Sequence, residues 1–124
     1  MDSDKPAARA RLIVVEDSFT VANSLKYLLE TAGCEVVGMA GNVRAALDLV
    51  DTKAFDLALL DIDLHGEQVT PVAEAVLRRG RSVIFLSGYG EAEVLPPQLR
   101  RLPRLEKPVE EKELLARIEQ ALAG

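Results

Sequence analysis

The sequence has little cysteine and little histidine, with one of each, Cys34 and His65, in 124 residues. A single cysteine excludes an intramolecular disulfide, which suits a reducing compartment. Cys34 follows Gly33 at a predicted helix-to-strand junction, and we expect it to be a buried, inert thiol. A single histidine cannot build a metal site alone, so we expect His65 to be a solvated loop residue.

Long apolar runs and an excess of positive charge are also missing. No apolar run approaches the roughly 18 residues of a membrane-spanning helix, and residues 1–10 lack the apolar stretch of a signal peptide. We therefore expect a cytoplasmic protein, with residues 1–10 as a flexible arm before one domain of residues 11–124. The net charge of −5 would repel a phosphate backbone, so we expect no nucleic-acid binding.

Four short apolar runs are present, and polar residues do not alternate with apolar ones within them. This pattern is typical of strands that are buried on both faces, as in a parallel sheet covered by helices. The runs are residues 12–15, 36–39, 57–60 and 83–86.

The segments between the runs repeat apolar residues with a helical period. The predicted N-caps are Ser18, Asn42 and Thr70, the last followed by Pro71 at the first helical position. Gly33 and Gly80 are predicted to end the first and third helices. A further helical stripe over residues 114–122 predicts the last helix.

The region after Phe85 breaks this rhythm. Pro96 and Pro97 are consecutive, and they limit any fourth helix to about two turns. A fifth strand near residues 102–105 contains Pro103, which favours an edge position. Together these elements predict an α/β, flavodoxin-like (βα)5 fold with strand order 2-1-3-4-5 and a short fourth helix.

Polar side chains stand at the carboxyl end of four predicted strands: Glu16 and Asp17, Asp61, Ser87, and Lys107. Carboxyl ends of parallel strands meet at one edge of the sheet, so these residues should converge there. Crowded carboxylates repel one another unless a cation intervenes, and oxygen ligands suit Mg²⁺. Mg²⁺ would keep Asp61 ionised, and a carboxylate can accept a phosphoryl group covalently.

These residues resemble the receiver domain of bacterial response regulators, over about residues 11–122. The resemblance implies that Asp61 is the phosphorylated residue. It also implies that Glu16, Asp17 and Asp61 hold Mg²⁺ together with the backbone carbonyl of Asp63.

The same resemblance implies roles for three further residues. Ser87 matches the switch hydroxyl and Lys107 the lysine that contacts the phosphoryl group. The resemblance also implies a cis peptide bond between Lys107 and Pro108, since proline makes cis bonds accessible.

One position departs from the common receiver pattern, and a second feature points to a subgroup. Arg104 stands three residues before the lysine, where most receivers carry Tyr or Phe. Residues 85–90, Phe-Leu-Ser-Gly-Tyr-Gly, are similar to the motif of the FAT GUY group, many of whose members are stand-alone receivers. Tyr89 either covers the phosphoryl group and sets its lifetime or packs under the short fourth helix. Gly88 gives the loop that carries Tyr89 conformational freedom.

The resemblance implies a single-domain regulator that is phosphorylated by a histidine kinase or a histidine phosphotransfer protein. It would act on a downstream regulatory protein or relay the phosphoryl group, and it would not be a turnover enzyme. Two alternatives stay open: a degenerate interaction module that is never phosphorylated, and a small phosphatase that uses Asp61-Ile62-Asp63 as an Asp-x-Asp pair. A nucleotide-binding loop is absent after the first predicted strand.

Overall fold

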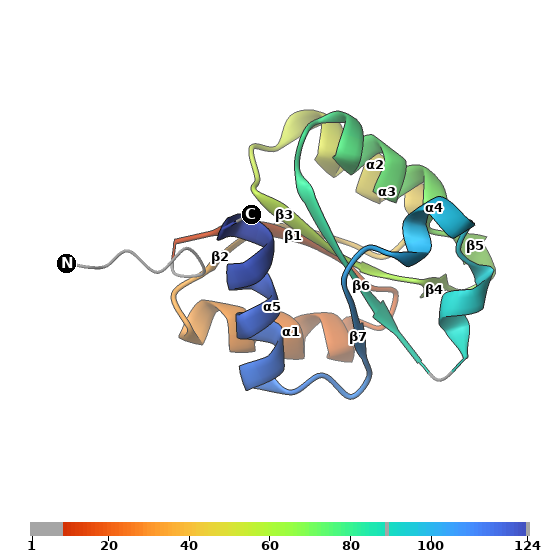
Figure 1. Cartoon of the computed structure of the whole chain (residues 1–124). Helices are drawn as coiled ribbons and strands as arrows, with labels where there is room; N and C mark the ends of the chain where they lie inside the picture. Colours follow the sequence, from red (N-terminus) through yellow and green to blue (C-terminus); the bar gives the residue numbers. More distant parts are fainter. Residues whose placement is uncertain (1–8, 89, 124) are drawn as a thin grey trace.

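A parallel sheet of five strands runs through the centre of the molecule (Figure 1). The structure is a computed structural model that describes residues 9–88 and 90–123. The strands, in their order across the sheet, are β2 (Glu35–Ala40), β1 (Arg11–Val15), β3 (Leu57–Asp61), β6 (Ser82–Ser87) and β7 (Arg104–Glu106). In chain order this is 2-1-3-4-5, and the predicted flavodoxin-like topology is confirmed.

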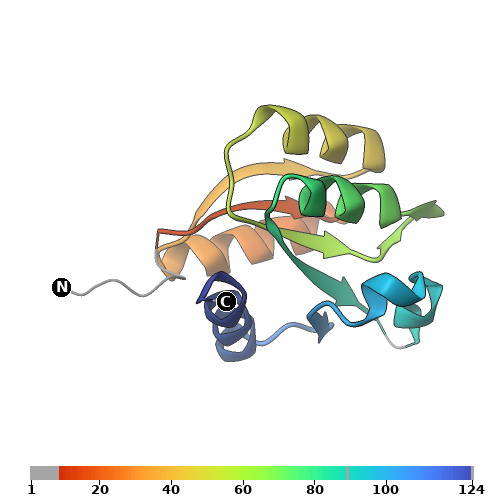
Figure 2. The same ribbon diagram turned by 45° about the horizontal axis from the view of Figure 1, so that its top comes forward.

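Two pairs of helices cover the two faces of the sheet (Figures 1 and 2). Helices α1 (Phe19–Thr31) and α5 (Glu111–Ala123) lie on one face, and α2 (Val43–Thr52) and α3 (Thr70–Arg78) lie on the other. Side chains of β1 alternate between the two cores: Leu12 and Val14 pack with α1 and α5, whereas Ile13 and Val15 pack with α2 and α3. This alternation is why an uninterrupted apolar run forms a strand in such a sheet.

The burial of the predicted strands depends on their place in the sheet. Strands β1, β3 and β6 are buried almost throughout, as predicted. The same prediction is wrong for β2, in which only Ala40 is buried. The reason is that β2 is an edge strand, whereas each of the other three has a neighbour on both sides.

Two of the three predicted helix caps are confirmed. Ser18 accepts a hydrogen bond from the backbone of Val21, and Asn42 accepts one from Ala45, at 3.3 and 2.8 Å. The prediction for Thr70 is wrong. Val69 is the N-cap of α3, Thr70 is its first helical residue, and α3 has no side-chain cap.

In its described residues, 88 and 90–103, the segment between β6 and β7 has only short helical pieces, as the two prolines predict. They are a 3-10 turn, η1 (Glu91–Val94), and one helical turn, α4 (Pro97–Arg100), for which Pro96 is the N-cap. Strand β7 occupies the predicted edge position, one to two residues later than expected. Pro103 lies before it and accepts a hydrogen bond from the backbone of Phe85.

The start of the chain departs from the predicted arm at two residues. Residues 1–8 lie outside the described part of the chain. Arg9 donates a backbone hydrogen bond to Gly33, and Ala10 is buried and accepts one from Glu35. These bonds join Arg9 to the turn before β2 and Ala10 to the first residue of β2.

Two further predictions concern Cys34 and membrane spans. Cys34 is buried as predicted, and burial raises the pKa of its thiol. Within residues 9–88 and 90–123, every helix is too short or too polar to cross a membrane.

A short antiparallel hairpin, which we did not predict, follows β3. It consists of β4 (Asp63–Leu64) and β5 (Glu67–Gln68). The two residues between these strands have positive φ angles, 51° at His65 and 84° at Gly66. Two consecutive residues of this kind match the backbone twist of a tight hairpin.

Candidate functional site

The predicted site residues lie together at one edge of the sheet. Asp61 is the last residue of β3 and Ser87 the last of β6, while Glu16 and Lys107 directly follow β1 and β7. The pairing of these parallel strands brings their carboxyl ends side by side. Ser87 is buried, and its carbonyl accepts the backbone N–H of Lys107 at 2.9 Å.

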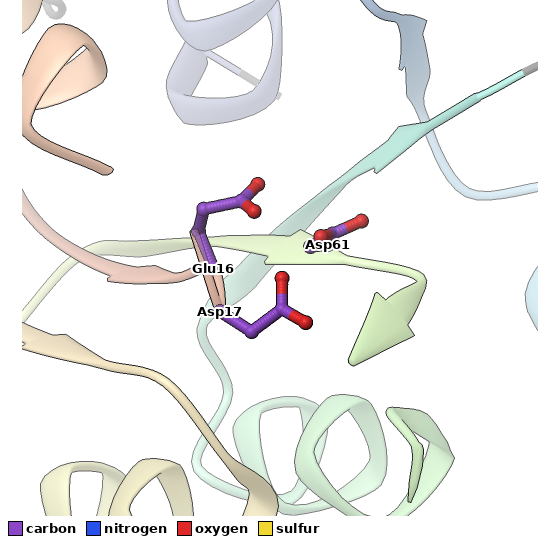
Figure 3. A group of neighbouring side chains, drawn as sticks. All are labelled: Glu16, Asp17 and Asp61. Carbon is purple, nitrogen blue, oxygen red and sulfur yellow. The ribbon is translucent and has the colours of Figure 1, made fainter. Parts of the chain in front are cut away.

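Three carboxylates face one another at the centre of this edge (Figure 3). Glu16, Asp17 and Asp61 each offer a carboxylate oxygen, and these oxygens lie within 4.8 Å of one another. Asp61 is only 1% exposed and Glu16 is also buried, whereas Asp17 lies nearer the surface. Such crowding is unfavourable for three negative charges unless cations neutralise it.

Lys107 supplies one of these positive charges. Its Nζ lies 3.1 Å from Oδ2 of Asp61 and 3.0 Å from Oε1 of Glu16. Backbone groups orient the other oxygens: Ser18 donates to Oε2 of Glu16, and Asp63 donates to Oδ1 of Asp61. The two buried carboxylates are therefore held in place from both sides.

The pKa values reflect this balance. Burial is the main cause that raises the pKa of Asp61 to about 6, and repulsion from Glu16 adds to it, against the lowering effect of Lys107. Burial by itself would lower the pKa of Lys107, but the Glu16 and Asp61 carboxylates outweigh it and the pKa is raised. One ammonium group is therefore too little to hold the pKa of Asp61 at its ordinary value of 3.8.

The donor set fits a hard divalent cation. Three carboxylates offer oxygen ligands, the type that Mg²⁺ prefers. Oε1 of Glu16 is buried and, although Nζ of Lys107 is near, accepts no well-directed hydrogen bond from the described residues. Oε1 of Glu16, which is paired with Nζ of Lys107 at 3.0 Å, has further lone-pair capacity for a cation.

His65 is exposed, as predicted, but it is more than a solvated loop residue. Its Nδ1 contacts Oδ2 of Asp17. The prediction missed this contact because it depends on the β4–β5 hairpin. The only signal in the sequence is the His65-Gly66 pair at the turn, and it is weak, since Asn-Gly and Asp-Gly are the usual pairs there.

Three further predictions concern residues that are near Asp61 and Lys107 in the sequence: Asp63, Pro108 and Arg104. The side chain of Asp63 is exposed, and the role of its carbonyl as a metal ligand stays a prediction. The Lys107–Pro108 peptide bond is cis, as predicted. Arg104 is exposed, and its guanidinium donates to the carbonyl of Arg100.

The predicted tuning residue Tyr89 lies outside the described residues, so neither of its two predicted positions is tested. The loop around it begins at Gly88, which is half-buried. It continues at Gly90, which has a positive φ of 79°.

An apolar groove begins beside the site and continues along α1. A hollow of about 470 Å³ has Leu28, Leu86 and Lys107 in its lining. A second hollow, of about 610 Å³, shares Leu28 and extends to Phe19 and Tyr27. Phe19 and Tyr27 are 78% and 75% exposed, which is unusual for side chains of this size.

Comparison with known proteins gives the family. A family model described as the response regulator receiver domain matches residues 12–119. Among curated proteins, the sensory transduction protein LytT of Bacillus subtilis is 28% identical over 115 residues, which are 90% of this chain and 46% of LytT. This chain spans less than half the length of that relative and of a similar staphylococcal protein.

Solved structures agree with that match. SdrG from Sphingomonas melonis Fr1 is 32% identical with a TM-score of 0.81, and the match covers 95% of this chain and 98% of SdrG. The response regulator PhyR from Brucella abortus is 28% identical with a TM-score of 0.79, and the match covers 96% of this chain and 51% of PhyR. The chain belongs to the response regulator receiver domain family.

Proposed function

We propose that Asp61 accepts a phosphoryl group from a sensor histidine kinase or a histidine phosphotransfer protein. The observation that carries this proposal is the environment of Asp61: a buried carboxylate at a strand end, between two further acids and a lysine. Membership of the receiver family supports the reaction class.

In the proposed reaction, one carboxylate oxygen of Asp61 attacks the phosphorus atom of a phosphohistidine. The new bond is an acyl phosphate, and the P–N bond breaks, so that the electron pair returns to the imidazole of the donor. The ammonium of Lys107, 3.1 Å from Asp61, neutralises charge on the incoming phosphoryl oxygens.

Glu16, Asp17 and Asp61, with the carbonyl of Asp63, would hold Mg²⁺. When bound, the ion lowers repulsion among the carboxylates and neutralises the phosphoryl group. The cation would also favour the ionised form of Asp61, whose pKa of about 6 is raised mainly by burial.

Ser87 would donate a hydrogen bond to the phosphoryl group and transmit the change to the loop after β6. That loop leads to η1 and α4, and Arg100 joins the two by donating to the carbonyls of Leu95 and Glu93. A shift of Ser87, Gly88 and Tyr89 would therefore alter this surface, which a downstream regulatory protein would bind.

We further propose a receiver of the FAT GUY group that passes on a signal and does not turn over a substrate. The motif at residues 85–90 supports the group, and the single-domain organisation stays a prediction from the sequence. A cytoplasmic location and the absence of nucleic-acid binding stay predictions from the sequence.

The phosphoryl donor would dock on the groove along α1. A donor histidine must approach Asp61 from outside, and the groove begins at Lys107, which contacts Asp61. Exposed aromatic side chains at Phe19 and Tyr27 provide apolar contact area of the kind that interfaces use.

The experiment that tests the proposal is intact-protein mass spectrometry after incubation with Mg²⁺ and acetyl phosphate or phosphoramidate. We expect one added phosphoryl group in the wild type and in Asp63→Asn, which keeps the backbone carbonyl. We expect none in Asp61→Asn or with EDTA. Labelling that persists in Asp61→Asn would move the acceptor to another residue.

A turnover assay with a generic phosphate ester, together with the mass measurement, separates the two alternatives. Steady turnover of a generic phosphate ester would favour an Asp-x-Asp phosphatase. A protein that takes no label from small donors or from a histidine phosphotransfer protein would be an interaction module.

A further inference from the structure

The β4–β5 hairpin connects the acceptor strand to the rim of the cation site through one side chain. His65 at its turn contacts Oδ2 of Asp17 with Nδ1. An ionised carboxylate can only accept a hydrogen bond, so Nδ1 is the donor. Because His65 engages a single oxygen of Asp17, the other oxygen remains available to an ion.

The backbone of this hairpin is fixed at several points. Leu64 and Val69 are buried in the core on the side of α2 and α3. Oε1 of Glu67 accepts the backbone N–H of Val43, the first residue of α2, at 2.9 Å. The imidazole is therefore presented to Asp17 by a supported hairpin, even though the His65 side chain is 88% exposed.

Residue 65 has a positive φ of 51°, a conformation that favours glycine, so the presence of a histidine there needs an explanation. Glycine adopts this conformation freely, whereas a side chain at Cβ makes it less favourable. A histidine here has a backbone cost that glycine would not have. The contact with Asp17 is an interaction that glycine could not make.

We propose that His65 is a positioning residue of the cation site: it orients the Asp17 carboxylate so that its second oxygen is directed at the ion. This rests on the proposed function, since it assumes that the three carboxylates hold Mg²⁺. Figure 3 shows the three carboxylates that would hold the ion, with one carboxylate oxygen of Asp17 directed toward Asp61 and the other turned away.

The size of the expected effect follows from similar contacts in metal sites. Loss of a group that hydrogen-bonds to a metal ligand typically weakens metal binding about 10- to 100-fold. Because His65 is solvent-exposed, we expect the lower end of that range, about tenfold.

Two substitutions of His65 distinguish an effect of the imidazole side chain from an effect of the backbone conformation. His65→Gly removes the imidazole and suits the positive φ, so the hairpin should keep its fold. His65→Asn places its amide Nδ2 at the position of the imidazole Nδ1, one bond from Cγ, and asparagine also tolerates this φ. Asn therefore restores the donor that Gly removes.

The test is isothermal titration of the metal-free full chain with Mg²⁺, for wild type, His65→Gly and His65→Asn, with Asp17→Asn as the reference for loss of a ligand. Thermal unfolding without Mg²⁺ checks that the variants fold. We expect about tenfold weaker binding for His65→Gly and binding close to wild type for His65→Asn.

Three outcomes would overturn the proposal. His65→Gly that binds Mg²⁺ as tightly as wild type, or more tightly, would show that the contact does not assist the site. His65→Asn as weak as His65→Gly would show that the donor is not the cause. Wild type without saturable Mg²⁺ binding would overturn the proposed cation site as well, so the two failures are distinguishable.

Discussion

The ammonium group of Lys107 donates a hydrogen bond to Asp61, with Nζ 3.1 Å from Oδ2. This bond joins the end of the edge strand β7 to the end of the central strand β3. It also pairs the positive charge of Lys107 with the negative charge of the buried Asp61 carboxylate. The first prediction follows from this pairing.

Lys107→Met should raise the pKa of Asp61 above about 6, because the lysine lowers this pKa through a hydrogen bond and through its charge. Phosphorylation by small donors should become slower by on the order of 100-fold, as for loss of one charge-stabilising group. Carboxyl carbon NMR titration and the rate of labelling measure the two effects. Lys112→Met, on the exposed side of α5, should change neither.

Asp61→Asn should stabilise the metal-free protein at pH 8 but hardly at pH 4. The folded-state pKa of Asp61, about 6, is above its ordinary value of 3.8, so between these values the folded protein binds more protons. Stability from this group is therefore present below pH 4 and lost as pH rises through 6. The difference of about two pH units corresponds to at most about 3 kcal/mol.

Urea unfolding of wild type and Asp61→Asn at both pH values, with EDTA, measures this difference directly. Mg²⁺ should restore stability to the wild type at pH 8 and should act less on the variant. A variant that is less stable than wild type at pH 8 without metal would contradict the prediction.

Tyr27→Ala should reduce phosphoryl transfer from a protein donor without changing labelling by acetyl phosphate. The side chain is 75% exposed and lines the groove that leads toward Lys107, and the lining of its own hollow includes none of the three carboxylates. We expect a loss of about tenfold, as for truncation of an aromatic anchor worth 1–2 kcal/mol. Transfer rates from the cognate donor, once identified, would test this.

The matched control for Tyr27→Ala is Tyr27→Phe, which keeps the apolar ring. It should retain most of the transfer rate. Equal losses with acetyl phosphate and with the protein donor would place the defect in the site and not in docking.

Asn42→Ala should lower the free energy of unfolding by about 1 kcal/mol, because it removes the side chain that accepts the N–H of Ala45 at the start of α2. Asn42→Asp keeps an accepting oxygen at a helix N-terminus and should be close to wild type. Urea unfolding of the three proteins makes the comparison. An Asn42→Ala variant as stable as wild type would show that Glu67, which accepts from Val43, is sufficient to cap the helix.

Much of the site could be predicted because its residues stand at strand ends. Glu16 and Asp61 are recognisable as the polar residues that directly follow apolar runs, and Lys107 follows the predicted fifth strand; parallel strands bring such ends together. The helix caps Ser18 and Asn42 were equally local and are confirmed. The predicted cap at Thr70 is not confirmed, because a threonine before a proline can also be the first helical residue.

Other properties depend on the neighbours that folding supplies. The exposure of β2 follows from its place at the edge of the sheet, although its apolar run resembles those of the central strands. The pKa of Asp61, about 6, follows mainly from burial, which depends on everything packed around it.

The sequence by itself determined the order of the five strands of the main sheet and the set of acids, hydroxyl and lysine at their ends, and its resemblance to receivers implied the cis bond before Pro108. Periodicity and strand ends are local properties, so they are visible without a structure. Only the tertiary structure decided that His65 contacts Asp17, 48 residues away, and that Glu67 caps α2, 24 residues before it. Both contacts depend on the two-residue turn at His65 and Gly66, which directs the side chains of the β4–β5 hairpin toward Asp17 and α2. No local sequence pattern predicts that direction.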